Sequence, residues 1–288
     1  MSIEFRHAEL DNGLTVIAEI DSDAHSAAAG FFVRTGARDE EPAVMGVSHF
    51  LEHMMFKGTE ARTAEMVDRD FDDIGANHNA FTTSEMTAFY AHCLPEHLAR
   101  AEEVLSDIMR PSIRTSDFDD EKKVILEEIA MYRDHPVFSL YERCLEIYYG
   151  EHPLAHRVLG TDDTVGEMER DAMMAYFQHR YSADNTVLAM AGKLDFDAMV
   201  ARVQQHCGHW ERTGAVRSHP AFTPGADRFE MTSATINRQY ILMACPAPPM
   251  GDDRRYAAAM LAQILGDTEG SRLYWALVEP GVADEAQA

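Results

Sequence analysis

The sequence predicts a fold that combines α-helices with β-strands, and three patterns indicate it. Residues 3–10 and 14–20 alternate apolar and polar side chains around Asp11-Asn12-Gly13, which is typical of a β-hairpin with a tight turn. Residues 27–34 (AAAGFFVR) and 185–192 (NTVLAMAG) are short apolar runs, as expected of buried strands. The segments between these runs carry helix-capping side chains and the Gly and Pro residues that stop helices.

Such caps and stops delimit the expected helices. These helices cover residues 43–56, 63–74, 95–109, 116–135, 138–150, 164–179 and 195–206. Ser116 is expected to cap the fourth helix, and Thr164 with Glu167 is expected to form a capping box at the start of the sixth. Residues 79–83 and 87–94 have the composition of two further strands.

The composition is acidic, with enough apolar residues for a substantial core. Of 288 residues, 46% are hydrophobic, and 49 Asp and Glu against 25 Lys and Arg give a formal net charge of −24. This charge argues against nucleic acid and anionic membranes as partners, whereas basic peptides are compatible with it. No stretch approaches the length of a membrane span, and the first residues lack the basic and apolar regions of a secretory signal. The four cysteines are widely spaced, as in proteins with reduced thiols, and we expect a cytoplasmic location.

Residues 46–59 (GVSHFLEHMMFKGT) carry the pattern of a metal site. His49 and His53 are four residues apart, so on a helix they lie on one face, with Glu52 on the same side. Neutral imidazoles suit Zn²⁺, and a nearby carboxylate can take a proton from metal-activated water. The order H-x-x-E-H is that of the inverzincins. The motif alone is also compatible with a helix face whose histidines make ordinary hydrogen bonds.

A third ligand is expected on the helix of residues 116–135. Glu121 and Glu128 lie two helical turns apart on one face of this helix, whereas Glu127 points about 100° away. The residues that mark this face as buried are Val124, Ile125, Ile129 and Tyr132. A carboxylate on an apolar face is costly unless it is paired or binds a metal. Glu128 is therefore the expected ligand, and Glu121 is expected to support it from behind.

Another group of ligand-type side chains lies at the expected end of the helix over 195–206. It consists of His206, Cys207 and His209. The group lacks a convincing fourth ligand, so we expect an ordinary structural role for it.

Five stretches of the chain, in a fixed order, carry a family resemblance. They are HFLEH within residues 46–59, NAFTTSEMTAFY at 79–90, EKKVILEEIAMYRDHP at 121–136, HPLAHRVLGTDDTV at 152–165 and YSADNTVLAMAGKLD at 181–195. Together they resemble the M16 metallopeptidases, which include pitrilysin, insulin-degrading enzyme and the mitochondrial processing peptidase. The resemblance covers nearly the whole chain and is closest to the smaller bacterial and organellar members. It implies an α+β fold in which a β-sheet is covered by helices, followed by the start of a second similar half.

The resemblance also implies roles for the residues of the metal motif. It makes His49, His53 and Glu128 the ligands of one zinc ion per chain, with Glu52 as the general base. Glu121 matches a carboxylate that supports the ligands in the family. The implied function is that of a zinc-dependent endopeptidase that hydrolyses peptides or unfolded polypeptide segments through a metal-activated water. The alternative is a non-catalytic M16-like subunit that serves assembly or substrate capture. A purely structural zinc site is disfavoured, because only three protein ligands are evident.

A substrate-binding strand follows from the same resemblance. Asn79 and Ala80 match a sheet-edge strand on which the family binds its substrate in an extended form, which is β-augmentation. Phe81 is expected to line a side-chain pocket there, although a place in the core suits it equally.

The family's internal repeat is faintly visible in the chain. A fixed offset lays Phe31 over Ile241 and places Ala259, Ala262 and Gln263 where the first copy has His49, Glu52 and His53. We therefore expect a catalytic domain over 1–210, a linker over 211–226 and an incomplete second domain over 227–288 that lacks the metal motif. The family's Arg and Tyr near this end correspond to Leu277 and Asp284, so weak peptidase activity is expected. We expect residues 227–288 to be covered either by a second copy of the chain, through self-association, or by a partner subunit.

Overall fold

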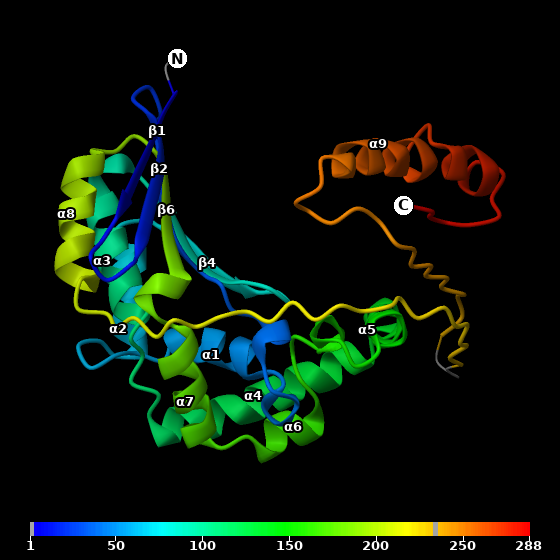
Figure 1. Cartoon of the computed structure of the whole chain (residues 1–288), viewed down its shortest axis with the longest axis horizontal. Helices are drawn as coiled ribbons and strands as arrows, with labels where there is room; N and C mark the ends of the chain where they lie inside the picture. Colours follow the sequence, from blue (N-terminus) through cyan, green and yellow to red (C-terminus); the bar gives the residue numbers. More distant parts are fainter. Residues whose placement is uncertain (1–2, 233–235) are drawn as a thin grey trace. The chain divides into compact units, whose positions relative to one another are not determined.

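The computed structural model describes residues 3–232 and 236–288, in two compact units that divide between Leu242 and Met243. In the described part of the first unit, six strands form one mixed sheet in the order β1-β2-β6-β3-β5-β4 (Figure 1). The strands are β1 (Ile3–Glu9), β2 (Thr15–Asp21), β3 (Ala27–Val33), β4 (Asn77–Thr82), β5 (Thr87–Cys93) and β6 (Thr186–Gly192). The expected hairpin, the two buried strands and the two further strands are all confirmed.

Strand pairing explains which apolar runs are buried. β3 lies between β5 and β6, and it places Phe31 beside Phe89 and Leu188, all of which are fully buried. β2 and β6 pair in parallel, whereas the other four pairs in the sheet are antiparallel. β4 lies at one edge of the sheet, so one side of this strand has no neighbour within the sheet.

Helices cover the sheet, as the α+β expectation requires. The helices of the first unit are α1 (Val47–Met55), α2 (Ala64–Asp73), α3 (Leu98–Ile108), α4 (Thr115–Arg133), α5 (Pro136–Tyr149), α6 (Asp162–Glu167), α7 (Arg170–Arg180) and α8 (Phe196–Cys207), whereas α9 (Arg254–Gly266) belongs to the second unit. α3 packs on β3 and β5, and α8 packs beside α3 and on β2 (Figure 1). α1 contacts α4, α7 and β4, which brings the two predicted ligand helices together beside the edge strand.

Four predicted helix starts are wrong. α5 begins at Pro136 rather than at residue 138. α1 begins at Val47 rather than residue 43, because Gly46 has a φ of 96° and cannot continue a right-handed helix backwards. α4 begins at Thr115 after Arg114, and Ser116 makes no cap. The expected helix over 164–179 is two helices, and its first part is capped by Thr161.

The Thr161 cap has a clear physical cause. Thr161 accepts the N–H of Thr164, while the hydroxyl of Thr164 accepts the N–H of Thr161 and donates to the carbonyl of Met45. The hydrogen bond to Met45 ties α6 to the segment just before α1. Thr164 is thus already inside the helix and cannot cap it.

Residues 213–225, here called the strap, run in extended form along the first unit. The guanidinium of Arg217 forms two hydrogen bonds with the buried carboxylate of Asp39, at 2.9 and 2.6 Å. Farther along, His152 Nε2 lies 3.1 Å from the carbonyl of Pro220, and the ring of Phe222 packs against Tyr149. The expected linker is therefore attached to the first unit along much of its length.

The second unit contains α9 and a turn of π-helix, Tyr274–Val278. Its last residue is fixed locally, since the N–H of Ala288 donates to the carbonyl of Gly266. Among the helices of residues 3–232 and 236–288, none has both the length and the apolar character that a membrane crossing requires.

Candidate metal centre

The metal helix α1 begins with an unusual cap. Gly46 precedes it in the left-handed conformation, and a Cβ there would lie 2.8 Å from the carbonyl oxygen of Leu159. The buried carboxyl group of Glu40 accepts the N–H groups of Gly46 and Ser48, at 2.7 and 2.8 Å. These contacts satisfy N–H groups at the helix start that would otherwise have no partner. The rotation of α1, and with it the direction of His49 and His53, is thereby fixed.

The three predicted ligands converge. His49 Nε2 and His53 Nε2 lie 3.8 and 3.7 Å from the same oxygen of Glu128, Oε2. One ligand atom from each of these residues lies within 4.8 Å of the others, and within the described residues this is the one such group of His, Cys, Asp and Glu. Two imidazole nitrogens and one carboxylate oxygen form a donor set found in catalytic zinc sites. The residues present therefore fit a zinc ion.

The two histidines differ in their surroundings. Burial, reinforced by the neighbouring His53, lowers the pKa of His49 to about 4, so this imidazole is neutral at neutral pH. For His53, burial lowers the pKa, but its hydrogen bond to Glu121 and the nearby carboxylates outweigh burial and raise it. Among the residues that the structure describes, none gives His49 Nδ1 a hydrogen-bond partner. His53 Nδ1, in contrast, lies 2.7 Å from Glu121 Oε1.

Glu121 lies behind the ligands, on the same face of α4 as Glu128. Its carboxylate is nearly fully buried and contacts Lys57 Nζ at 2.5 Å as well as His53. Burial opposes its ionisation, yet the hydrogen bonds from His53 and Lys57 prevail and lower the pKa of Glu121. It is ionised at neutral pH and can accept the Nδ1–H of His53, which leaves Nε2 free to bind a metal.

Glu52 lies on the same helix as both histidines and faces the edge strand. Its Oε2 accepts a hydrogen bond of 2.6 Å from the hydroxyl of Thr82, at the end of β4. Burial raises the pKa of Glu52, and the Thr82 bond opposes part of that rise. The residue is therefore a partly buried carboxylate held in one orientation, as a general base requires.

The predicted substrate-binding residues lie together on β4, the strand at the edge of the sheet. Asn79 and Phe81 are exposed, and Ala80 is half-buried. Phe81 is 37% exposed, with its ring 6.3 Å from that of Tyr90, so it lies on the surface and not in the core. The side chain of Asn79 accepts the N–H of Ala80.

One residue of the predicted buried face of α4 is misplaced. Val124 is 47% exposed, whereas Ile125 and Ile129 are buried as expected. Glu127 is exposed, as expected of the solvent side. The buried face of α4 is rotated away from Val124, so the predicted ligand Glu128 lies at the margin of that face.

Three contacts of the site were missed by sequence reasoning: those of Glu40, Lys57 and Thr82. Lys57 follows His53 by four residues, and this spacing was a usable signal. Glu40 and Thr82 contact α1 from segments that no local pattern connects to it.

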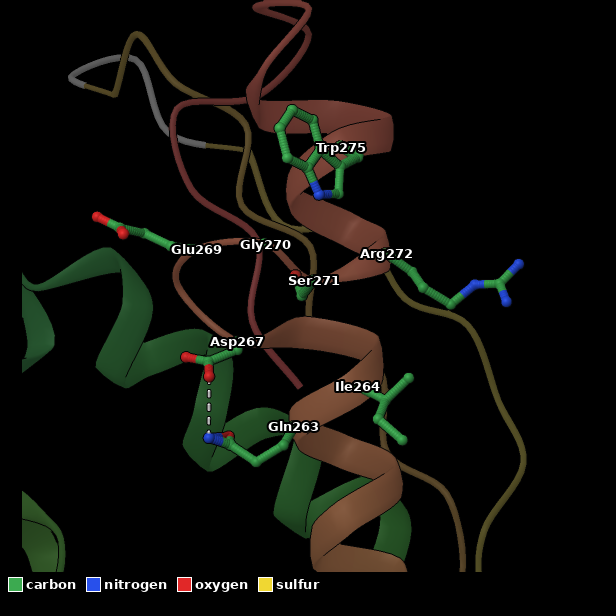
Figure 2. Close-up of a pocket in the computed structure, with 8 residues that line it drawn as sticks. All are labelled: Gln263, Ile264, Asp267, Glu269, Gly270, Ser271, Arg272 and Trp275. Carbon is green, nitrogen blue, oxygen red and sulfur yellow. Dashed lines mark hydrogen bonds between the residues drawn. The ribbon is translucent and has the colours of Figure 1, made fainter.

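The group around His206 makes ordinary contacts. His206 Nδ1 lies 3.1 Å from the buried carboxylate of Glu102, and the thiol of Cys207 donates to Ser106. In the second unit, Figure 2 shows residues that line a pocket, among them Trp275 and Gln263, whose side chain donates to Asp267. Its lining residues include none of the predicted site residues.

Family models identify the chain. Residues 15–162 match the insulinase family, peptidase family M16, and residues 167–288 match the M16 inactive domain. The chain belongs to peptidase family M16. Its α+β fold and zinc-protease relatives agree with that membership.

Two curated relatives of this M16 chain are named uncharacterized zinc proteases. That of Mycobacterium tuberculosis is 34% identical over 274 residues, which cover 93% of this chain and 63% of the relative. That of Bacillus subtilis is 32% identical over 270 residues, or 91% of this chain and 64% of the relative. The chain thus spans less than two thirds of the length of these relatives.

Solved structures share the fold. A protease from Helicobacter pylori superimposes with a TM-score of 0.85 at 18% identity, over 99% of this chain and 71% of that one. An M16-like peptidase structure from Alicyclobacillus acidocaldarius gives a TM-score of 0.67 at 28% identity, over 77% of this chain and 52% of that one. The first of these supports the fold alone.

Proposed function

We propose that this M16 chain is the metal-binding part of a zinc-dependent endopeptidase that hydrolyses peptides or unfolded polypeptide segments. The observation that carries the proposal is the convergence of His49, His53 and Glu128, with Glu52 beside them on the same helix. The zinc-protease names of the relatives support the choice of metal. One zinc ion per chain is expected, because the described residues hold a single group of this kind.

Each residue of the chain has a distinct role in this proposal. His49, His53 and Glu128 would hold the zinc. When bound, zinc supplies Lewis acidity, which polarises a peptide carbonyl and lowers the pKa of water. Glu52 accepts the proton of the attacking water and passes it to the leaving amine. The hydrogen bond from Thr82 holds Glu52 in place for both transfers.

The edge strand supplies the substrate-binding surface in this proposal. β4 has one unpaired side and ends at Thr82, whose side chain contacts Glu52. A peptide that adds to β4 as a further strand would therefore run past the general base. Such a peptide must be extended, which accounts for a preference for unfolded segments. Asn79, Ala80 and Phe81 would contact it.

Substitution of the general base tests the proposal. Glu52→Gln should retain zinc, because Glu52 is not among the converging ligands, and should lose at least about a hundredfold in peptide hydrolysis. Glu127→Gln is the matched control, since Glu127 is an exposed carboxylate next to the ligand Glu128 and should leave turnover unchanged. Turnover is measured with a fluorogenic peptide. Normal cleavage by Glu52→Gln would show that the role of Glu52 is wrong.

A further inference from the structure

Lys57 lies just beyond the end of the metal helix, with its backbone held from two sides. Its N–H donates to the carbonyl of Met54, and its carbonyl accepts a hydrogen bond from Arg114. Gly58 follows with a φ of 102°, so the chain turns sharply away immediately after Lys57. The backbone is thus fixed at a point one helical turn from His53, from which the side chain reaches back toward the site.

The ammonium group of Lys57 contacts one oxygen of a buried carboxylate whose other oxygen contacts a predicted ligand. Lys57 Nζ lies 2.5 Å from Glu121 Oε2, and His53 Nδ1 lies 2.7 Å from Glu121 Oε1. The side chain of Glu121 is only 6% exposed, so water cannot readily replace either partner. A buried carboxylate that loses its cationic partner keeps an uncompensated charge, which is strongly unfavourable.

We propose that Lys57 is a positioning residue of the metal centre: by holding the carboxylate of Glu121, it fixes the ring of His53 with Nε2 directed toward Glu128. This inference rests on the proposed zinc function. Lys57 touches no reacting atom and no ligand atom. It acts through Glu121, whose free rotation would otherwise let the His53 imidazole turn or change its tautomer.

No neighbouring lysine on α4 can take over this contact. The two lysines that follow Glu121 on α4 have other partners: Lys122 Nζ donates to the carbonyls of Gly166 and Met168, and Lys123 pairs with Asp120. Lys123 and Asp120 are both mostly exposed, so their ion pair contributes little. Lys123 therefore provides a matched control for the removal of one positive charge near Glu121.

The test is the zinc affinity of the full chain, measured by competition with a chromogenic chelator. Lys57→Met should weaken zinc binding by roughly tenfold to a hundredfold, the usual scale for loss of a residue that supports a ligand. Lys123→Met should bind zinc like the wild type. Lys57→Arg keeps the charge and should recover most of the affinity. In a Glu121→Gln background, Lys57→Met should cause no further loss, because the two residues act in series.

The outcomes separate this inference from the proposed function. If the wild type binds no zinc, the proposed function fails and the role of Lys57 fails with it. If the wild type binds zinc and Lys57→Met binds it equally well, only the role of Lys57 is overturned. No recovery in Lys57→Arg, or an additive loss in the double variant, would also overturn it.

Discussion

Glu40 has a buried carboxyl group that contacts the start of α1. Burial raises its pKa to about 8, although the N–H groups of Ser48 and Gly46 favour the ionised form. In the unfolded chain the same group titrates near 4.5. Between these two values the folded protein holds a proton on Glu40 that the unfolded chain releases, so this group makes the free energy of unfolding fall as pH rises from about 4.5 to about 8.

Glu40→Gln should remove this pH dependence. The amide cannot ionise, and its single oxygen can accept only one of the two N–H groups that Glu40 binds, so the variant should be less stable than the wild type but without this pH dependence. Because each pKa unit corresponds to about 1.4 kcal/mol, we expect the wild type to lose stability between pH 5 and pH 8 by up to a few kcal/mol more than the variant. Urea unfolding at both pH values gives the comparison. Equal changes in the two proteins would show that Glu40 has an ordinary pKa in the folded state.

At the residue scale, the convergence of the predicted ligands could be predicted because the spacing of the motif is local. His49, Glu52 and His53 lie within one helical turn, and the apolar face of α4 pointed to Glu128. The predicted buried face of α4 was slightly wrong, because it included Val124, which is exposed. Helix periodicity alone does not show which margin of an apolar face meets the core.

At the scale of elements, the strap connects parts of the first unit that lie close to the metal centre. Arg217 contacts Asp39 and also donates to the carbonyl of Glu85, in the turn between β4 and β5. Asp39 precedes Glu40, which contacts the start of α1. The carboxylate of Asp39 is 1% exposed and the side chain of Arg217 is 8% exposed, so this ion pair is shielded from water. Loss of this ion pair should lower the free energy of unfolding by on the order of 3 kcal/mol. Arg180, which lies 3.7 Å from Asp39, should reduce this effect, because it still supplies a positive charge.

Arg217→Ala should release the strap without unfolding the first unit. The expected result is at least about tenfold faster chymotryptic cleavage after Phe222, because a protease needs its substrate segment detached and extended. The product is followed by mass spectrometry. Arg228→Ala is the control, since Arg228 is exposed and pairs with the neighbouring Glu230. Equal cleavage rates in wild type and Arg217→Ala would contradict the anchoring role.

The strap and the helix starts show what sequence patterns cannot settle at this scale. Proline and glycine residues predicted a linker over 211–226, but the ion pair that holds it joins positions far apart in the chain. Thr161 and Thr164 are both good capping residues, and the tertiary contact of Thr164 with Met45 decided between them.

At the scale of the whole molecule, the order of the strands was not predicted. β2 and β6 pair although Asp21 and Thr186 are separated by most of the first unit's helices, and no local pattern specifies such a pairing. The fold class was nevertheless accessible, because the family resemblance supplied it.

The second unit leaves apolar side chains uncovered on α9 and on the turn after it. Tyr256, Met260, Leu261, Ile264 and Trp275 are each more than half exposed. Exposed apolar surface of this kind tends to associate, so we expect the 288-residue chain to form dimers or larger species as its concentration rises. Light scattering during size exclusion measures this, and Leu261→Lys should shift the protein toward monomer. A monomer at all concentrations would contradict the prediction.

The most direct test of the central claim is the zinc content of the purified chain. We predict one zinc per chain by elemental analysis in the wild type, and almost none in a His49→Ala, His53→Ala double variant that remains folded. The Glu52→Gln variant should keep its zinc. Equal zinc content in the wild type and the double variant would contradict the assignment of His49, His53 and Glu128 as a metal centre.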